Sequence, residues 1–338
     1  MLVDNDPLPI STIARFNHLN PLTFEKQYKD HLSDFREWEK LNNSSWWNDI
    51  NWLVFEQNFS KRMSIDEVAV SMWELYTVLT NKEKRWKKWC LAAIIRWTKN
   101  EVVSSKLSKV PFEKRLEVKE ITADLANSMD WICRTNFMWA SLTADRFHVQ
   151  QIISEAVQEL RIEERRKAIN EENQRNLKNR LKSSKEKEDS KEVVLRNWDT
   201  KRQLLARSRY SLFKPSNKWT ESQRERMDIL FQLYPQIKKA YDLSMYFRNI
   251  FEKSKTVKEA RLWFEKWYQK IQEEWIVQLI SASETIKVNE WKILGYFENR
   301  ETNASAESFN AKIKWFRALV RWVRDTSFFL YRLQKLYA

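Results

Sequence analysis

The chain has 338 residues, 43% of them hydrophobic, so it can bury one large core or two smaller ones. Sixty Lys and Arg outnumber 46 Asp and Glu, and the formal net charge of +14 favours a polyanionic partner, most simply nucleic acid. With two cysteines and three histidines, the sequence excludes a disulfide framework and a zinc site of two cysteines and two histidines. The longest strongly apolar run, "CLAAII", is too short to span a bilayer, and the N-terminus has no signal-peptide layout. We therefore expect a cytoplasmic protein with no membrane partner.

The first 150 residues predict an α/β layout. Residues 1–60 combine early prolines with a polar, aromatic-rich stretch, which we interpret as an N-terminal extension. Short β-branched runs then predict three consecutive antiparallel strands, followed by helix, strand, helix and strand. The predicted elements are strands at 63–70, 74–80 and 90–98, a helical piece at 100–116 interrupted by Pro111, a strand ending at Asp124, a helix at 127–137 and a strand ending near Asp145. This order indicates a mixed sheet.

The strands stop after Val149. Residues 151–195 are dominated by charges and amides, which favours a long solvated helix or helical arm with a flexible centre near Ser183 and Ser184. Residues 218–290 return to helical periodicity. The sequence thus predicts a second, all-helical region in front of the last part of the chain.

The segment Thr302–Asp325, "TNASAESFNAKIKWFRALVRWVRD", carries one acid, Glu307, in its first twenty-three residues. If this segment is a helix, each residue is turned by about 100° from the one before it. The apolar residues then form one stripe, and Glu307 lies on another face with amide and cationic neighbours. The apolar stripe consists of Phe309, Ile313, Phe316 and Val320, and the polar face of Glu307, Asn310, Lys314, Arg317 and Arg321. The helix is either an ordinary surface helix with a chance Glu, or it presents a functional acid in a cationic setting.

Two further acids stand where a charge is costly. Asp66 lies inside the first predicted strand, flanked by Ile65 and Val68, and Asp124 ends the fourth. A carboxylate in a buried strand needs compensation, which a divalent cation commonly provides. If these strands are neighbours, as in an RNase H-like sheet, both carboxylates reach one place, and Glu307 is the candidate third ligand of a site for two Mg²⁺ ions.

A basic segment precedes the second helical region. Lys201–Lys214, "KRQLLARSRYSLFK", has five cations and no acid, with Tyr210 and Phe213 among them. Cations interleaved with aromatics suit a surface that tracks a nucleic-acid strand, although the same spacing fits an ordinary amphipathic helix.

The composition has one anomaly, a single glycine, Gly295, beside eighteen tryptophans. Average usage predicts about 24 glycines in a chain of this length. Trp73 follows Ser71 and Met72 between two predicted strands, where a turn normally uses glycine. Either many turns are built without glycine, or many of the printed tryptophans are not tryptophan.

Five motifs follow one another along the chain. They are "SIDE" at 64–67, "ELYTVLTNK" at 74–82, "DRFHV" at 145–149, "LLARSRYSLFK" at 204–214 and "NRETNASAESFNAKIKWFRALVRWVRDTSFFLYRL" at 299–333. Together they resemble DDE transposases of the ISL-three group of bacterial insertion sequences. The resemblance covers residues 30–338 in order, and its long C-terminal motif is the most specific part.

The resemblance implies an RNase H-like fold interrupted by a helical insertion. It also implies cleavage at transposon ends and strand transfer by the freed 3′-hydroxyl, with two Mg²⁺ ions that Mn²⁺ can replace. The implied partners are double-stranded DNA, at transposon ends and target, and further copies of the chain on that DNA, in a nucleoid-associated setting. The alternative is a non-catalytic DNA-binding remnant or partnered subunit of a transposase.

The resemblance also assigns site residues. Asp66 falls on the family's first catalytic Asp and Glu307 on its final Glu. For the second Asp, Asp124 after the fourth strand is preferred to Asp145 in "DRFH"; Asp145 and His148 then support the site or the flanking DNA, unless His148 is only a packed or capping residue. Residues expected to contact DNA are Asn303, Asn310, Lys314, Arg317, Arg321, Arg324, Arg207 and Arg209.

The expected domains are an N-terminal extension (1–60), the first part of the catalytic core (61–150), a helical insertion with a charged arm (151–290) and a C-terminal helical part of the core (291–338). Relatives often carry a zinc-binding and helix-turn-helix region for transposon ends, for which this chain lacks the cysteines. A separately encoded N-terminal DNA-binding protein is therefore a candidate partner.

The departures from the family pattern bear on the tryptophans. The family has glycine where this chain has Trp73, Trp97 and Trp322, whereas Trp38 and Trp219 fall where the family itself uses tryptophan. We extend the first group to Trp86, Trp89, Trp198 and Trp275. The hypothesis is that the gene reads UGA as glycine and was translated with UGA as tryptophan.

Overall fold

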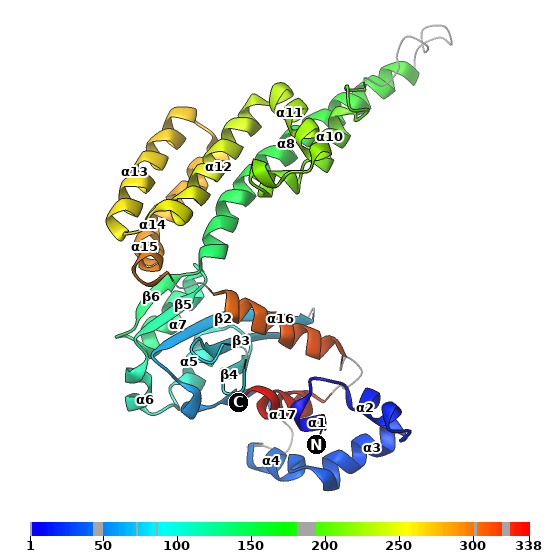
Figure 1. Ribbon diagram of the computed structural model, residues 1–338, viewed down its shortest axis with the longest axis vertical. Helices are drawn as coiled ribbons and strands as arrows, with labels where there is room; N and C mark the ends of the chain where they lie inside the picture. The colour runs from blue at the N-terminus through cyan, green and yellow to red at the C-terminus, as the bar shows by residue number, and fades with distance from the viewer. Residues whose placement is uncertain are drawn as a thin grey trace. The chain divides into compact units, whose positions relative to one another are not determined.

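The computed structural model describes residues 2–42, 50–71, 74–85, 87–180, 194–300, 303–319 and 325–338. The chain divides into two compact units (Figure 1). Unit 1 consists of Met1–Asp145 and Glu301–Ala338, and unit 2 of Arg146–Arg300. The division at residues 60, 150 and 290 stays a prediction about domains.

Unit 1 is built on a six-stranded sheet in the order β1-β4-β3-β2-β5-β6. The strands are β1 (Trp52–Val54), β2 (Arg62–Ser71), β3 (Glu74–Asn81), β4 (Leu91–Arg96), β5 (Glu120–Ala123) and β6 (Ser141–Ala144). β2, β3 and β4 are antiparallel neighbours, whereas β5 pairs in parallel with β2, and β6 pairs in parallel with β5. The fold class is therefore confirmed as a mixed α/β, RNase H-like core with a large helical region.

Strand β2 separates two apolar cores. Because side chains alternate along a strand, Met63 and Ile65 point into one core and Val68 into the other. Ser64 and Asp66 have the same parity as Val68 and therefore lie on its face of the sheet. This face carries the candidate site.

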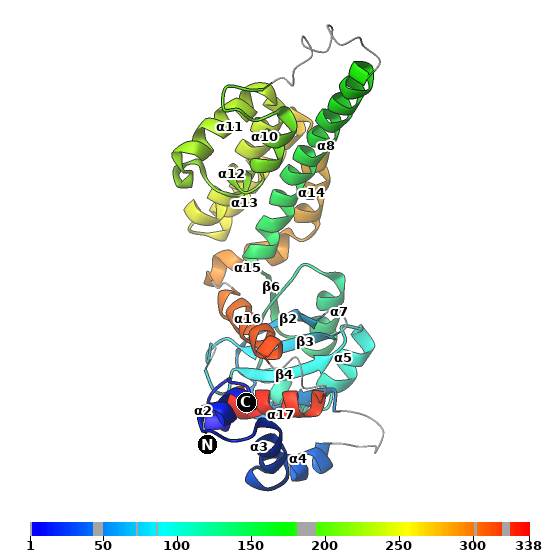
Figure 2. The ribbon, with the colours of Figure 1, turned by 90° about the vertical axis from the view of Figure 1, so that its right-hand side faces the viewer.

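Helices cover both faces of the sheet (Figure 2). α5 (Asn100–Leu107) and α7 (Asn127–Asn136) pack on one face, and α16 (Ala304–Leu319) and α17 (Thr326–Tyr337) on the other. The remaining helices of unit 1 are α1 (Leu2–Asn5), α2 (Ile10–Phe16), α3 (Pro21–Gln27), α4 (Phe35–Asn42) and α6 (Phe112–Glu117).

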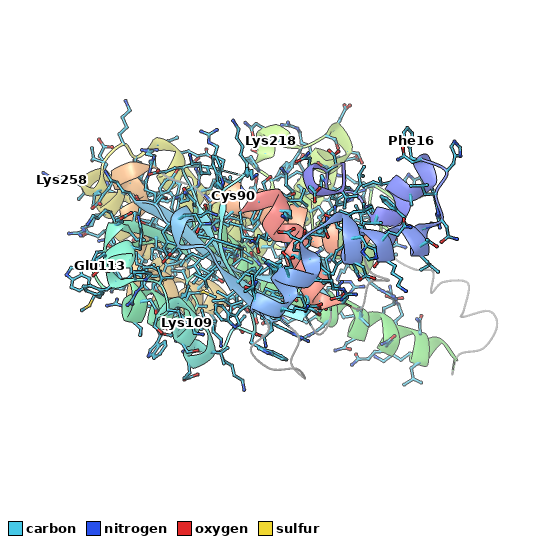
Figure 3. The ribbon with its side chains drawn as sticks, turned by 90° about the horizontal axis from the view of Figure 1, so that it is seen from below. Phe16, Cys90, Lys109, Glu113, Lys218 and Lys258 are labelled. Atoms are coloured by element: carbon cyan, nitrogen blue, oxygen red, sulfur yellow. The ribbon has the colours of Figure 1, made fainter. Side chains whose placement is uncertain are left out.

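Several apolar side chains of the helices before β1 belong to the core of unit 1. The Phe35 ring lies 5.0 Å from that of Phe328 and 5.2 Å from that of Tyr331, both on α17. Figure 3 shows Cys90 within the molecule, where it is fully buried, and Phe16 at the outer end of α2, where it is exposed. Cys90 and Cys133 are both buried, and neither forms a disulfide.

Within the predicted helix 302–325 the structure describes α16 (Ala304–Leu319), and residues 302 and 320–324 lie outside the described residues. α16 ends at Leu319, and a second helix, α17, starts after Asp325, whose side chain accepts a hydrogen bond from the Phe328 N–H at 2.9 Å. Phe309, Ile313 and Phe316 are buried as the apolar stripe predicts, whereas Val320 lies outside the described residues.

Unit 2 is helical. Its helices are α8 (Arg146–Arg180), α10 (Lys201–Arg207), α11 (Glu221–Leu233), α12 (Pro235–Lys253), α13 (Val257–Glu274), α14 (Val277–Val288) and α15 (Glu290–Asn299). α8 packs against α10, α12 and α14, so the predicted long charged helix has a buried side as well as a solvated one (Figure 1). Ser183 and Ser184 lie outside the described residues. None of the helices in the described ranges is long and apolar enough to cross a bilayer.

Four tryptophans have a left-handed backbone. Among the described residues, seven non-glycine residues have positive φ, including Trp89 (66°), Trp97 (82°), Trp198 (63°) and Trp275 (49°). These four tryptophans are between 49% and 85% exposed.

Candidate active site

Asp66 and Asp124 lie on neighbouring parallel strands. Ser64 of β2 pairs with Thr122 of β5. Asp66 lies two residues after Ser64, still within β2. Asp124 lies two residues after Thr122, directly after the last residue of β5. The same register therefore places the two aspartates side by side, on the face of the sheet that α16 covers.

Two asparagines tie α16 to β2. The Asn310 amide Nδ2 donates a hydrogen bond to Asp66 Oδ2 at 2.6 Å. Seven residues earlier in the chain, just before the helix begins, the Asn303 Oδ1 accepts a hydrogen bond from the Ser64 hydroxyl. Asn303 is 1% and Asn310 6% exposed, so both side chains, which we expected to contact DNA, are held against the sheet.

Glu307 lies between these two attachment points. Its backbone N–H donates to the Asn303 carbonyl at 3.0 Å in the first turn of α16, and its side chain is half-buried. Because residues three and four apart share one side of a helix, Glu307 shares the side of Asn303 and Asn310, which faces β2.

A fourth carboxylate, Glu67, responds to the two aspartates. Partial burial, the negative charge of Asp124 and the negative charge of Asp66 raise the pKa of Glu67 above its ordinary value. The sequence prediction did not single out Glu67, although it stands next to Asp66 in "SIDE". The two charge contributions are consistent with Glu67, Asp66 and Asp124 lying near one another.

The cations of α16 differ in their surroundings. Lys314 is exposed. Arg317 is 8% exposed, and its Nε and Nη2 donate to Glu74 of β3 at 2.8 Å and 2.6 Å. This bidentate contact lowers the pKa of Glu74 and fastens the helix to a second strand. Arg321 and Arg324 lie outside the described residues.

The two auxiliary candidates fall in different units. Asp145 follows β6, is 2% exposed and donates its backbone N–H to the Ala123 carbonyl at 2.9 Å. His148 lies in the first turn of α8 in unit 2, with its ring 5.8 Å from that of Phe147. Of the remaining candidates, Arg207 forms an ion pair with the buried Asp199, and Arg209 is exposed.

The donor chemistry of the acids suits a hard divalent cation. Asp66 and Asp124 offer carboxylate oxygens, which Mg²⁺ prefers. In the described ranges, however, no three His, Cys, Asp or Glu side chains stand close enough together to hold a metal ion. The expected convergence of Asp66, Asp124 and Glu307 on one metal ion therefore stays a prediction.

Sequence reasoning missed the residues that hold the site together. Ser64 and Glu74 had no role assigned, yet they bond Asn303 and Arg317 of the last chain segment. The period-two alternation could have placed Ser64 beside Asp66 on one face. No local signal pairs Glu74 with Arg317, because the two are far apart in the chain.

The chain was compared with known proteins. No curated protein and no solved structure matches it. A family profile described as "Transposase", that of the ISL-three group of DDE transposases, matches residues 63–333, which include both strands and the helix of the candidate site. The chain therefore belongs to the ISL-three family of DDE transposases.

Proposed function

We propose that this transposase cleaves DNA at transposon ends and joins the freed 3′-hydroxyl to a target strand, in a reaction that depends on divalent metal. The observation that carries the proposal is the register of β2 and β5, which sets Asp66 beside Asp124, together with the attachment of the Glu307 helix to Asp66 through Asn310. Transposases act on DNA, and the charge of +14 suits a polyanionic substrate.

Asp66, Asp124 and Glu307 would hold two Mg²⁺ ions, which Mn²⁺ could replace. When bound, such ions activate the attacking oxygen and stabilise charge on the leaving oxygen of a phosphodiester. Asn310 orients the Asp66 carboxylate, and the Lys314 ammonium is free to reach a DNA phosphate. We assign Arg321, Arg324, Arg207 and Arg209 to phosphate contacts, and Asp145 and His148 to the support of the site.

The test is cleavage of a labelled transposon-end duplex in Mg²⁺ or Mn²⁺, by protein made with glycine at the suspect tryptophans. Asp66→Asn and Glu307→Gln should each lower the rate by about a hundredfold or more, because each removes a metal ligand. Asp124→Asn should do the same and Asp145→Asn should not, which distinguishes the two candidates for the second aspartate. Glu101→Gln, an exposed carboxylate on α5, is the matched control.

Cleavage that survives in Asp66→Asn or Glu307→Gln would count against the assignment. The second candidate function is a non-catalytic DNA-binding subunit, which the net charge of +14 also supports. It predicts salt-dependent DNA binding that is indifferent to metal and to both substitutions.

Three further expectations belong to this proposal. The chain works as a homo-oligomer on paired transposon ends, it is associated with the nucleoid of a bacterial cytoplasm, and a separately encoded protein recognises the terminal DNA sequence.

A further inference from the structure

A buried positive charge lies inside unit 2. The Arg161 side chain on α8 is 6% exposed. Its Nε donates to the Gln158 Oε1 at 2.7 Å, and its Nη1 donates to the Leu205 carbonyl at 2.9 Å. Both acceptors are neutral, so these two hydrogen bonds bring no negative charge to the guanidinium.

Two more guanidinium groups lie next to Arg161. Arg165 is one helical turn farther along α8, and its Nε is buried with no hydrogen-bond partner. Arg209 follows α10, which lies along α8, and its backbone carbonyl accepts a hydrogen bond from Gln158 Nε2 at 3.1 Å (Figure 1). Burial and the positive charges of Arg209 and Arg165 lower the pKa of Arg161.

Neighbouring cations have carboxylate partners, but these three do not. On and beside α10, Lys201, Arg202 and Arg207 pair with Glu171, Glu172 and Asp199. Over the ranges that the structure describes, no ion pair joins Arg161, Arg165 or Arg209 to an acid. The positive charges of Arg165 and Arg209 repel that of Arg161, and an anion bound among them would offset this repulsion by attraction to all three.

The outer side of this cluster is accessible and has an aromatic face. Arg209 is exposed, and its guanidinium carbon lies 5.4 Å from the ring centre of Tyr210, which is 67% exposed. Guanidinium groups bind phosphate through a planar fork of N–H donors, and an aromatic face beside them suits a nucleic-acid strand.

We infer that Arg165 and Arg209 form a binding site on unit 2 for phosphate groups of the DNA backbone, with Arg161 buried behind them as a fixed positive charge. The inference rests on the proposed function, because it takes DNA as the ligand. It is separate from the acids of unit 1 and needs no metal.

The experiment measures DNA binding by the full chain carrying Asp66→Asn, which prevents cleavage during the measurement. The probe is a fluorescently labelled duplex, titrated at several salt concentrations. Each phosphate contact adds about 0.9 to the slope of log affinity against log salt. Arg165→Gln with Arg209→Gln should therefore make the slope shallower by about 2. The same variant should lower the affinity at low salt by about tenfold or more.

The matched control is Lys167→Gln with Lys238→Gln, which removes the same charge from cations already paired with Glu164 and Asp242. Its slope should stay close to that of the parent. A third variant, Arg165→Lys with Arg209→Lys, keeps the charge and should keep the slope while binding more weakly, since lysine lacks the planar fork. Thermal melting of each variant checks that it is folded.

Two results would overturn the inference. If Arg165→Gln with Arg209→Gln binds DNA like the control Lys167→Gln with Lys238→Gln, the proposed site is wrong. The proposed function then still stands, because the parent binds DNA. If the parent itself does not bind DNA, the proposed function and this inference fail together.

Discussion

Trp89, Trp97, Trp198 and Trp275 adopt the backbone conformation that only glycine enters without a steric cost. A side chain with a Cβ there costs about 1 kcal/mol or more, and these exposed indoles recover little of it by burial. Trp267 is different, because its ring is fully buried and its N–H donates to the Leu243 carbonyl at 3.0 Å. The four positions have the geometry of glycine sites.

Replacing these four tryptophans one at a time with glycine should raise the free energy of unfolding by up to about 1 kcal/mol each, since the strain of the left-handed backbone is removed. Chemical denaturation measures the change. Trp267→Gly is the opposite control and should lower stability by about 3 kcal/mol or more, because it empties a core position. A loss of stability at all four positions would contradict the interpretation.

The nucleotide sequence tests the underlying hypothesis separately. It should show UGA at Trp97 and Trp275, and UGG at Trp38 and Trp219, which we expect to be genuine tryptophans. UGG codons at Trp73, Trp97 and Trp322 would refute it.

The Asn310 side chain on α16 donates a hydrogen bond to Asp66, one of the catalytic candidates. Asn310→Ala should leave the fold intact, lower the cleavage rate by about tenfold and raise the Mg²⁺ concentration needed for half-maximal cleavage, because the Asp66 carboxylate loses its orienting donor. The rate against Mg²⁺ concentration is the measurement. Asn170→Ala, on an exposed position of α8, is the control; an unchanged Mg²⁺ requirement in Asn310→Ala would exclude the positioning role.

At the scale of elements, the Arg317–Glu74 pair joins α16 to β3 in a largely buried setting. Removing one partner leaves the other charge without compensation, so Arg317→Leu or Glu74→Gln should each cost about 3 kcal/mol. The double variant should cost less than the sum, because it leaves no unpaired charge. Equal, additive losses in a denaturation experiment would show that the two residues do not act as a pair.

The same pair predicts a pH dependence. Arg317 lowers the pKa of Glu74 in the folded state below the ordinary value of 4.5. The stabilisation is therefore complete above about pH 4.5 and is lost as the pH falls through the lower, folded-state pKa. Unfolding midpoints between pH 3 and pH 7 should show a steeper acid loss in the parent than in Glu74→Gln.

The regular elements follow from local pattern, and the exceptions have physical reasons. β2 to β6 coincide with the β-branched and apolar runs from which the sequence predicts five strands. β1 has three residues, too few for any period, and its place at the sheet edge depends on pairing with β4. Arg317 lies on the polar face of α16 by periodicity, but its burial follows from Glu74 on β3, which periodicity within a helix cannot reveal.

At the scale of the whole molecule, the order of the strands in the sheet explains why part of the site could be predicted from the sequence. Parallel neighbours align their residues in register, so Asp66 and Asp124 could be brought together from strand order alone. The position of Glu307 depends on side-chain contacts between segments more than 200 residues apart, such as Asn310 to Asp66. No pattern within one segment encodes such a contact.

Unit 1 needs its second segment to complete its core. Phe309, Ile313 and Phe316 of α16, with Phe329 and Leu330 of α17, are all buried against the sheet or the N-terminal helices. A chain that stops after Arg300 should therefore expose this apolar surface, bind a hydrophobic dye and unfold without a cooperative transition of unit 1. Cooperative unfolding equal to that of the full chain would contradict this requirement.

The insertion of unit 2 between β6 and α16 sets an order of assembly on the ribosome. Asp66 and Asp124 leave the exit tunnel early, but Glu307 is added only after the whole of Arg146–Arg300 has been translated, at about 5 to 20 residues per second. A nascent or prematurely terminated polypeptide that ends before Glu307 thus lacks this acid and most of helix α16, which carries it. If Glu307 is the third metal ligand, as we propose, a partly synthesised chain cannot cleave DNA before translation has passed α16.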